Sequence, residues 1–239
     1  MRKRLVKILD DIARASIIVV GDVMLDEYII GNSERISPEA PEPIITEQKR
    51  RYVPGGAANV AVNITSLGAK AHLFGIIGDD SEGELFRKTL GSAGVDDKGI
   101  RTVKDRPTTR KTRLIARGNQ VLRVDRETTA DIESFTEKEI IESIIKLPEK
   151  VVVVSDYAKG TITTELVKSL NEAGKCVIVD PKSSDLGKYS HSYIVTPISH
   201  WVLLRRFDVC RQQFRRLYLQ HYMHRQVNFL LLQSLLKLR

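Results

Sequence analysis

Short apolar runs that alternate with helical patterns constrain the fold of this 239-residue chain more than any other feature. Each run is rich in β-branched residues, as is typical of strands that are buried on both faces. The runs span residues 16–21, 71–77, 151–155 and 176–180, and the helical patterns span residues 57–67, 82–90, 136–146 and 163–173. The alternation predicts an α/β fold with a mainly parallel sheet and helices on both of its faces.

Two stretches break this rhythm, at about residues 28–53 and 102–127. Both are rich in Thr, Arg, Ile and Val and alternate with a period of two in places, for example over residues 111–117. Such a pattern is typical of half-exposed strands. We expect the two stretches to form a small β-sheet beside the main one, where it can act as a lid over a pocket.

The cysteine content and the N-terminus narrow the class of protein. Cys176 and Cys210 have no Cys or His neighbour at metal-ligand spacing, which argues against a disulfide framework or a zinc module. Residues 1–11 alternate basic, apolar and acidic side chains, unlike a secretion leader. We therefore expect a cytoplasmic protein.

Most of the net charge of +8 lies in residues 198–239, which hold eight Lys or Arg and one acid. This segment contains no Gly, Ala, Pro, Thr or Glu, unlike the nearly neutral residues 1–197. It can be interpreted as a tail from a shifted reading frame, a packed helix, or a basic helix on a membrane surface. We expect one domain over residues 1–197 followed by an aberrant basic tail, with neither nucleic acid nor membrane as a partner.

The stretch Pro54-Gly-Gly-Ala-Ala-Asn-Val-Ala61 surrounds one amide side chain with bare backbone. Gly55 and Gly56 have no Cβ, so a ligand can approach their amides closely. Asn59 then offers a donor and an acceptor to hydroxyl groups. A tight strand-to-helix turn in which Asn59 caps or packs locally is the alternative.

Several motifs together resemble the ribokinase family of sugar kinases, also called the phosphofructokinase B type. Residues 55–61, followed by Gly75-Ile-Ile-Gly78-Asp79-Asp80-Ser-Glu-Gly83, resemble its N-terminal signature. Within the family, residues 21–28, 35–41 and 155–160 resemble the heptose 7-phosphate kinase branch. The resemblance spans residues 17–197 and implies a ribokinase-like fold. It also implies phosphorylation of D-glycero-D-manno-heptose 7-phosphate at the anomeric hydroxyl, with ATP and Mg²⁺, for ADP-heptose and lipopolysaccharide core biosynthesis.

The resemblance also implies roles at the sugar end of the site. Gly55, Gly56 and Asn59 would line the pocket, and Asp26 matches the acid that holds a sugar hydroxyl. Arg35 would suit the 7-phosphate, because a guanidinium binds phosphate oxygens bidentately. A loop carboxylate or helix cap is the alternative for Asp26, and a solvated charge is the alternative for Arg35.

Two further pairs lie where strands are expected to end, the edge at which open α/β sheets bind ligands. Asp156 and Lys159 are expected at the substrate, where Lys159 can offer a point charge to a phosphate; a surface ion pair is the alternative. Asp180 and Lys182 are weaker candidates for a nucleotide-side contact, which an ordinary turn explains as well. We expect no metal-ligating residue in the chain.

The chain departs from the family after Thr196-Pro197. The family's Asn and Glu do not follow, and Gly-Ala-Gly-Asp, which supplies the aspartate base and an amide cradle for phosphate, does not occur. We therefore assign no catalytic residue and expect little activity. The chain reads as a C-terminally truncated or frameshifted kinase with an incomplete sheet.

Alternatives to a kinase remain open on the sequence alone. They are a non-catalytic sugar-phosphate-binding remnant, another ribokinase-family carbohydrate kinase, and a membrane- or nucleic-acid-associated protein that binds through its basic tail. Because lid-forming sheets in the family often pair between subunits, the resemblance also implies a homodimer formed through the lid.

Overall fold

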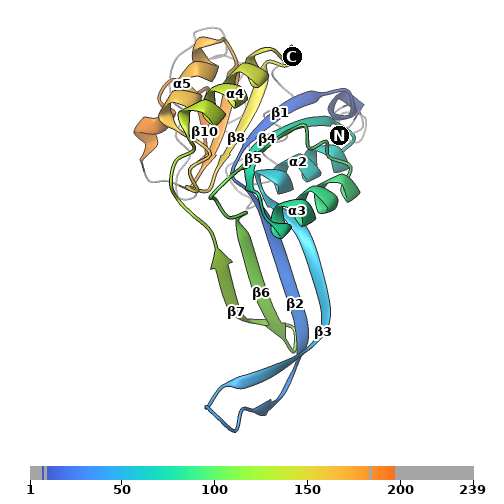
Figure 1. Ribbon diagram of the computed structural model, residues 1–239. Coiled ribbons are helices and arrows are strands. Elements are labelled where there is room, and N and C mark those ends of the chain that lie inside the picture. Colours follow the sequence, from blue (N-terminus) through green and yellow to red (C-terminus); the bar gives the residue numbers. More distant parts are fainter. Residues whose placement is uncertain (1–6, 8–9, 183–184, 197–239) are drawn as a thin grey trace.

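The computed structural model describes residue 7, residues 10–182 and residues 185–196 (Figure 1). The predicted tail at residues 198–239 lies outside this part of the chain. The described residues form a six-stranded main sheet and a separate four-stranded second sheet.

The main sheet is parallel throughout and has the strand order β10-β9-β8-β1-β4-β5. Its strands are β1 (Ser16–Gly21), β4 (Lys70–Gly78), β5 (Gly99–Val103), β8 (Val151–Asp156), β9 (Cys176–Pro181) and β10 (Ile194–Val195). The helices are α2 (Ala57–Ser66), α3 (Ser81–Ser92), α4 (Ser134–Ile145) and α5 (Thr164–Glu172), with a 3-10 turn η1 (Leu186–Tyr189). The four strands and four helices expected from the sequence are all present.

Helices cover both faces of the main sheet, as Figure 1 shows, because successive side chains of a strand point to opposite faces. Ile17 and Val19 of β1 belong to the apolar cluster that includes α2 and α3. Ile18 and Val20 belong to the cluster that includes α4 and α5. Burying each such side chain stabilises the fold by about 1.5–3 kcal/mol. The predicted α/β architecture is confirmed.

The second sheet has the order β3-β2-β6-β7 and runs away from the main sheet (Figure 1). Its strands are β2 (Val23–Ile36), β3 (Pro43–Gly56), β6 (Arg110–Ala116) and β7 (Asn119–Arg126). β2 pairs with β3 in antiparallel and with β6 in parallel fashion. The predicted small sheet is thus present, but it begins at Val23, and residues 102–103 belong to β5 of the main sheet instead.

Gly56 joins the end of β3 in the second sheet to helix α2. It has φ 59° and ψ −133°, a conformation open almost solely to glycine, and α2 begins at the next residue. A Cβ at Gly56 would lie 2.2 Å from the carbonyl oxygen of Asp22, which accepts the amide of Ala57 at 2.9 Å. The bare backbone of Gly56 therefore lets α2 begin directly against the end of β1.

Gly56→Ala should destabilise the protein, because the new methyl group meets backbone and φ is unsuited to alanine. Backbone strain alone costs about 1–3 kcal/mol. Gly91→Ala in α3 is the control: nothing lies within 4 Å of its Cβ position, so it should stabilise by about 0.5–1 kcal/mol. Urea denaturation of both variants measures the difference, and equal stability would contradict this account of Gly56.

Candidate functional site

Asp22, directly after β1, is a buried carboxylate at the carboxyl end of the main sheet, at 1% exposed. Its Oδ2 accepts the backbone amides of Tyr157 at 2.7 Å and Lys159 at 3.0 Å, and its Oδ1 accepts that of Thr161 at 3.1 Å. The loop after β8 is thus wrapped around one carboxylate. Two of its residues, Ala158 and Gly160, have positive φ, a conformation that these bonds help to hold.

Burial raises the pKa of Asp22, and the charge of Asp156 adds to this effect, while hydrogen bonds from Thr161 and Lys159 oppose it. The sequence analysis did not select Asp22 as a site residue. The available signal was an acid within an otherwise apolar run, since residues 17–25 contain no other charged side chain. Asp22 fixes the position of the site rather than facing it.

Asp26 lies within β2 and not in a loop or at a helix cap, which are the alternatives considered for it. Its Oδ1 accepts Nη1 of Arg113, on β6, at 2.6 Å. Its Oδ2 lies over Gly55, where a Cβ would come within 2.5 Å of that oxygen. Gly55 is therefore bare because the Asp26 carboxylate occupies the space above it. One carboxylate oxygen is held by a cation, and the other lies over open backbone.

The remaining sugar-end candidates lie at different distances from Asp26. Asn59 is in the first turn of α2, three residues past Gly56, and its side chain is exposed. Arg35 lies nine residues beyond Asp26 on β2, roughly 30 Å along an extended strand, and is exposed near the hairpin tip. The fold brings Gly55 against Asp26, with Gly56 and Asn59 following at the start of α2, but does not bring Arg35 there within one chain.

Asp156 ends β8 and is fully buried. Its Oδ1 accepts the amide of Ala158 at 2.7 Å, and its Oδ2 accepts Nζ of Lys188 at 2.8 Å and the hydroxyl of Tyr189 at 2.6 Å. The carboxylate therefore points toward η1 and fastens it to the sheet. This placement favours a structural role over the direct substrate contact that the sequence analysis assigned to Asp156.

Lys159, in the loop after β8 of the main sheet, forms an ion pair with the end of the second sheet. Its Nζ lies 2.6 Å from Oε1 of Glu127, just after β7, and its side chain is 17% exposed. Lys111 of β6 reaches the same carboxylate at 3.0 Å and Asp125 at 2.9 Å. The predicted alternative of an ion pair is present, but the pair is largely buried at the junction and not solvated on a surface. Of its two lysines, Lys111 lies directly opposite Asp26 in the pairing of β2 with β6.

Tyr157, in the loop after β8, contacts one of the candidate nucleotide-side residues. Burial raises the pKa of its hydroxyl, and the negative charges of Asp180 and Asp26 raise it further. Nζ of Lys182 lies over the Tyr157 ring, 5.3 Å from its centroid. Burial likewise raises the pKa of Asp180, whose Oδ1 is 3.4 Å from the hydroxyl of Thr196. Lys182 thus contacts Tyr157, which was not among the predicted site residues.

The same part of the chain was expected to contain no metal-ligating residue. Within residues 10–182 and 185–196, no group of three or more His, Cys, Asp or Glu side chains is arranged to hold a metal ion. The residues around Asp26 have a different character. What they form is an anionic acceptor over bare backbone, with arginine and lysine side chains around it.

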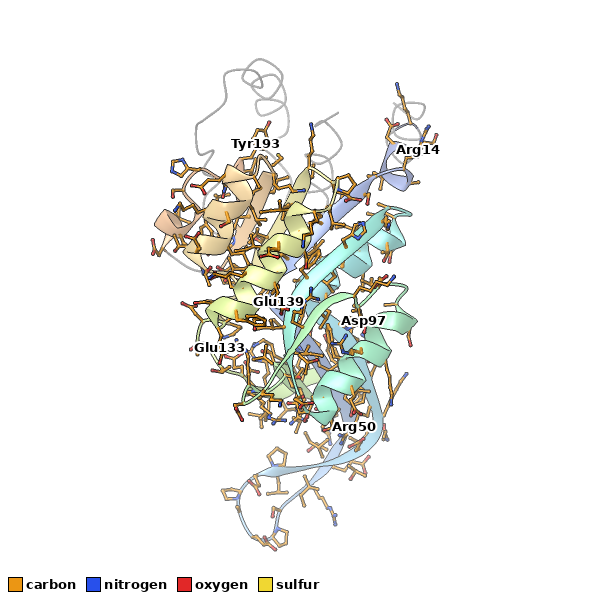
Figure 2. The ribbon with its side chains drawn as sticks, turned by 45° about the horizontal axis from the view of Figure 1, so that its top comes forward. Arg14, Arg50, Asp97, Glu133, Glu139 and Tyr193 are labelled. Carbon is orange, nitrogen blue, oxygen red and sulfur yellow. The ribbon has the colours of Figure 1, made fainter. Side chains whose placement is uncertain are left out.

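The two faces of the second sheet have different charges and contacts. On the face opposite Asp26, Glu27 is buried and accepts the hydroxyl of Thr112 at 2.6 Å and Nη1 of Arg50 at 2.9 Å. Arg110 extends this network to Glu82 of α3 at 2.7 Å. Figure 2, in which Arg50 is labelled, shows the second sheet running away from the body. This face binds the second sheet to α3. The opposite face carries Asp26 and is the face of the candidate site.

Comparison with known proteins identifies the family. Residues 14–200 match the model of the pfkB family of carbohydrate kinases. The chain belongs to this family. Its predicted membership of the phosphofructokinase B type is confirmed, and with it the class of enzyme to which the chain is related.

Relatives within the pfkB family include the bifunctional protein HldE from two organisms. The Helicobacter pylori strain J99 protein is 42% identical over 187 residues, covering 76% of this chain and 40% of the relative. The Desulfatibacillum aliphaticivorans protein is 40% identical over 191 residues, covering 76% of this chain and 38% of the relative. The chain thus spans about two fifths of the length of these curated relatives.

Solved structures confirm the ribokinase-like fold. The tetrameric inhibited form of Escherichia coli phosphofructokinase-2 superposes with a TM-score of 0.59 at 20% identity, covering 77% of this chain and 61% of that chain. Arabidopsis thaliana ribokinase, solved with ribose and ATP, gives a TM-score of 0.56 at 19% identity and covers 77% and 60%. Among the described residues, no helix is long and apolar enough to cross a membrane.

Asp22→Ala should release the loop after β8, because three backbone amides lose their acceptor. Each buried donor left unpaired costs about 1–3 kcal/mol, so the variant should lose more than about 3 kcal/mol of folding free energy. Asp79→Ala, at an exposed carboxylate, is the matched control. Thermal unfolding and amide exchange at residues 157–161 check this; unchanged exchange there would contradict the proposed hold.

Lowering the pH should destabilise the second sheet. Burial alone would raise the pKa values of Asp80, Glu82 and Glu127, but their hydrogen bonds and nearby cations outweigh it and hold all three pKa values below the usual range. Asp80 and Glu82 pair with Arg126, and Glu127 pairs with Lys159. A carboxylate with a lowered folded pKa stabilises the fold above its unfolded pKa and loses that contribution as the pH falls through the folded value.

The test is amide exchange in β7 between pH 7 and pH 3, corrected for the intrinsic rates. Protection should fall below the ordinary pKa values of 3.8 for Asp and 4.5 for Glu. Glu127→Gln should make the fall shallower. Asp22 has a raised pKa, so its contribution to the stability of the fold increases as the pH falls. If the stability rose steadily toward pH 3, the effect of Asp22 would exceed that of Asp80, Glu82 and Glu127, and the prediction would be wrong.

Proposed function

We propose that this chain carries the sugar end of a kinase that phosphorylates D-glycero-D-manno-heptose 7-phosphate at its anomeric hydroxyl. The product would feed ADP-heptose and lipopolysaccharide core biosynthesis in the cytoplasm. The identity to HldE over 187 residues supports this assignment. The observation that carries it is the Asp26 carboxylate, which lies over the bare backbone of Gly55 beside the start of α2.

Asp26 would accept a hydrogen bond from a sugar hydroxyl through Oδ2, while Arg113 holds Oδ1 in place. Gly55 leaves room for the Asp26 carboxylate itself, since a Cβ there would lie 2.5 Å from Oδ2. The exposed Asn59 amide can donate to and accept from a neighbouring hydroxyl. A polyhydroxylated ligand is thereby oriented by one charged and one neutral polar group.

ATP and Mg²⁺ are the proposed phosphoryl donor and metal, by resemblance to the family. The 239 residues contain no Gly-Ala-Gly-Asp, so they offer neither the family's aspartate base nor its amide cradle. Removing a general base typically costs about 10²–10⁴-fold in rate, and removing oxyanion donors costs a similar factor. We therefore propose that this chain alone binds the sugar phosphate but turns it over very slowly.

A non-catalytic sugar-phosphate-binding protein is the second candidate, and the missing base favours it. Both candidates take a small-molecule sugar phosphate as partner. A homodimer formed through the second sheet is proposed with either. β7 is exposed at the edge of that sheet, and Val121, Leu122 and Val124 are each about half exposed on it.

The proposal is tested by thermal unfolding with heptose 7-phosphate and by ADP release with ATP and magnesium. A ligand at a hundred times its Kd should stabilise the wild-type chain by about 2.7 kcal/mol. Asp26→Ala should lower the affinity about ten- to a hundredfold, because a hydrogen bond to a charged group is lost. Asp79→Ala is the control and should bind as the wild type does.

Three results separate the candidates. Ligand stabilisation without ADP release supports a binding half-site. ADP release that depends on Asp26 means that a base is supplied by a group other than the family motif. No stabilisation of the wild-type chain by heptose 7-phosphate contradicts the proposed substrate.

A further inference from the structure

The Asp26 face of the second sheet carries a row of two arginines on either side of one aromatic ring. Strand register places Tyr28 of β2 directly opposite Arg51 of β3 and also opposite Arg113 of β6. Directly opposed residues project on the same face of a sheet. Both guanidinium carbons lie 5.2 Å from the centroid of the Tyr28 ring. The Tyr28 ring therefore contacts one arginine on each of the two strands that flank β2.

The row has unbalanced charge. Arg113 is paired with Asp26 and is 20% exposed, whereas Arg51 is exposed. Within the described part of the chain, no carboxylate lies within ion-pair distance of Arg51. An anion bound between the two guanidinium groups would balance the positive charge of Arg51. Their planar donor sets match phosphate oxygens bidentately.

The position of the row fits the length of a phosphorylated sugar. Tyr28 lies two residues beyond Asp26 on the same face of β2, roughly 7 Å along the strand. A ligand with one hydroxyl on Asp26 can therefore place a terminal phosphate at the row. Arg35, the residue that the sequence analysis selected for the phosphate, lies roughly 30 Å from Asp26 along the same strand.

We propose that Arg51 and Arg113, held against Tyr28, bind the phosphate ester of the substrate and thereby select phosphorylated over unphosphorylated sugars. This inference rests on the proposed function and names the residues that determine its substrate class. Arg113 has a second role as a positioning residue, because its ion pair fixes the Asp26 carboxylate over Gly55. The arginine row thus links recognition of the phosphate to the orientation of the sugar.

The experiment measures three dissociation constants by titration calorimetry on the 239-residue protein. The ligands are heptose 7-phosphate, the same heptose without phosphate, and inorganic phosphate. The informative quantity is the ratio of the two sugar affinities, since general damage to the site lowers both affinities together. We expect the wild-type protein to prefer the phosphorylated sugar by about a hundredfold.

Arg51→Gln should lower that ratio about tenfold and leave the affinity for the unphosphorylated sugar unchanged, because Arg51 does not contact Asp26. Arg113→Gln should lower the ratio and also weaken the unphosphorylated sugar, because Asp26 loses its partner. Arg51→Lys keeps the charge and should restore part of the ratio. Arg117→Gln, at an exposed cation in the β6–β7 turn, is the matched control and should leave the ratio unchanged.

The outcomes distinguish this inference from the proposed function. If both sugars bind and the ratio is unaffected in Arg51→Gln and Arg113→Gln, the inference is overturned and the function stands. A ratio that collapses in Arg35→Gln also overturns it and places the phosphate at the hairpin tip. If neither sugar binds the wild-type protein, the function fails. Inorganic phosphate binding that is lost in Arg51→Gln would then still support an anion site at the row.

Discussion

The buried carboxylate of Asp22 holds together the parts of the structure on which the site depends. Its oxygens accept three amides from the loop after β8, and its own carbonyl accepts the first amide of α2. β1, the loop and α2 meet at this residue, and β2 starts immediately after it. The position of Asp26 over Gly55 follows from that junction, because the two lie on the strands that continue from it.

The two faces of the second sheet make different contacts. One face is fastened to α3 by Glu27, Arg110 and Glu82, so the sheet is held at a fixed angle to the body. The other face carries Asp26 and the arginine row, and Lys159 closes the junction from the body. Burying charge is costly unless the charge is paired, and here the pairs lie between elements rather than within them. Some of these pairs lie within the second sheet, such as that of Arg113 with Asp26, and others join it to the rest of the protein, such as that of Lys159 with Glu127.

The strands and helices of the main sheet could be predicted because their apolar periodicity is local. β5 was missed because it is five residues long and starts with a glycine. The importance of Gly55 and Gly56 was predictable, but the crowding groups are Asp26 and the Asp22 carbonyl, which only the folded chain brings there. Arg113 could not be found in the same way, since its contact with Asp26, 87 residues away in sequence, depends on the register of β2 and β6.

A crystal structure of this chain with heptose 7-phosphate tests the central claim most directly. The account predicts that a sugar hydroxyl lies within hydrogen-bond distance of Asp26 Oδ2 and that the phosphate lies between the guanidinium groups of Arg51 and Arg113. A sugar bound away from Gly55, or one whose phosphate lies at the hairpin tip beside Arg35, would contradict it.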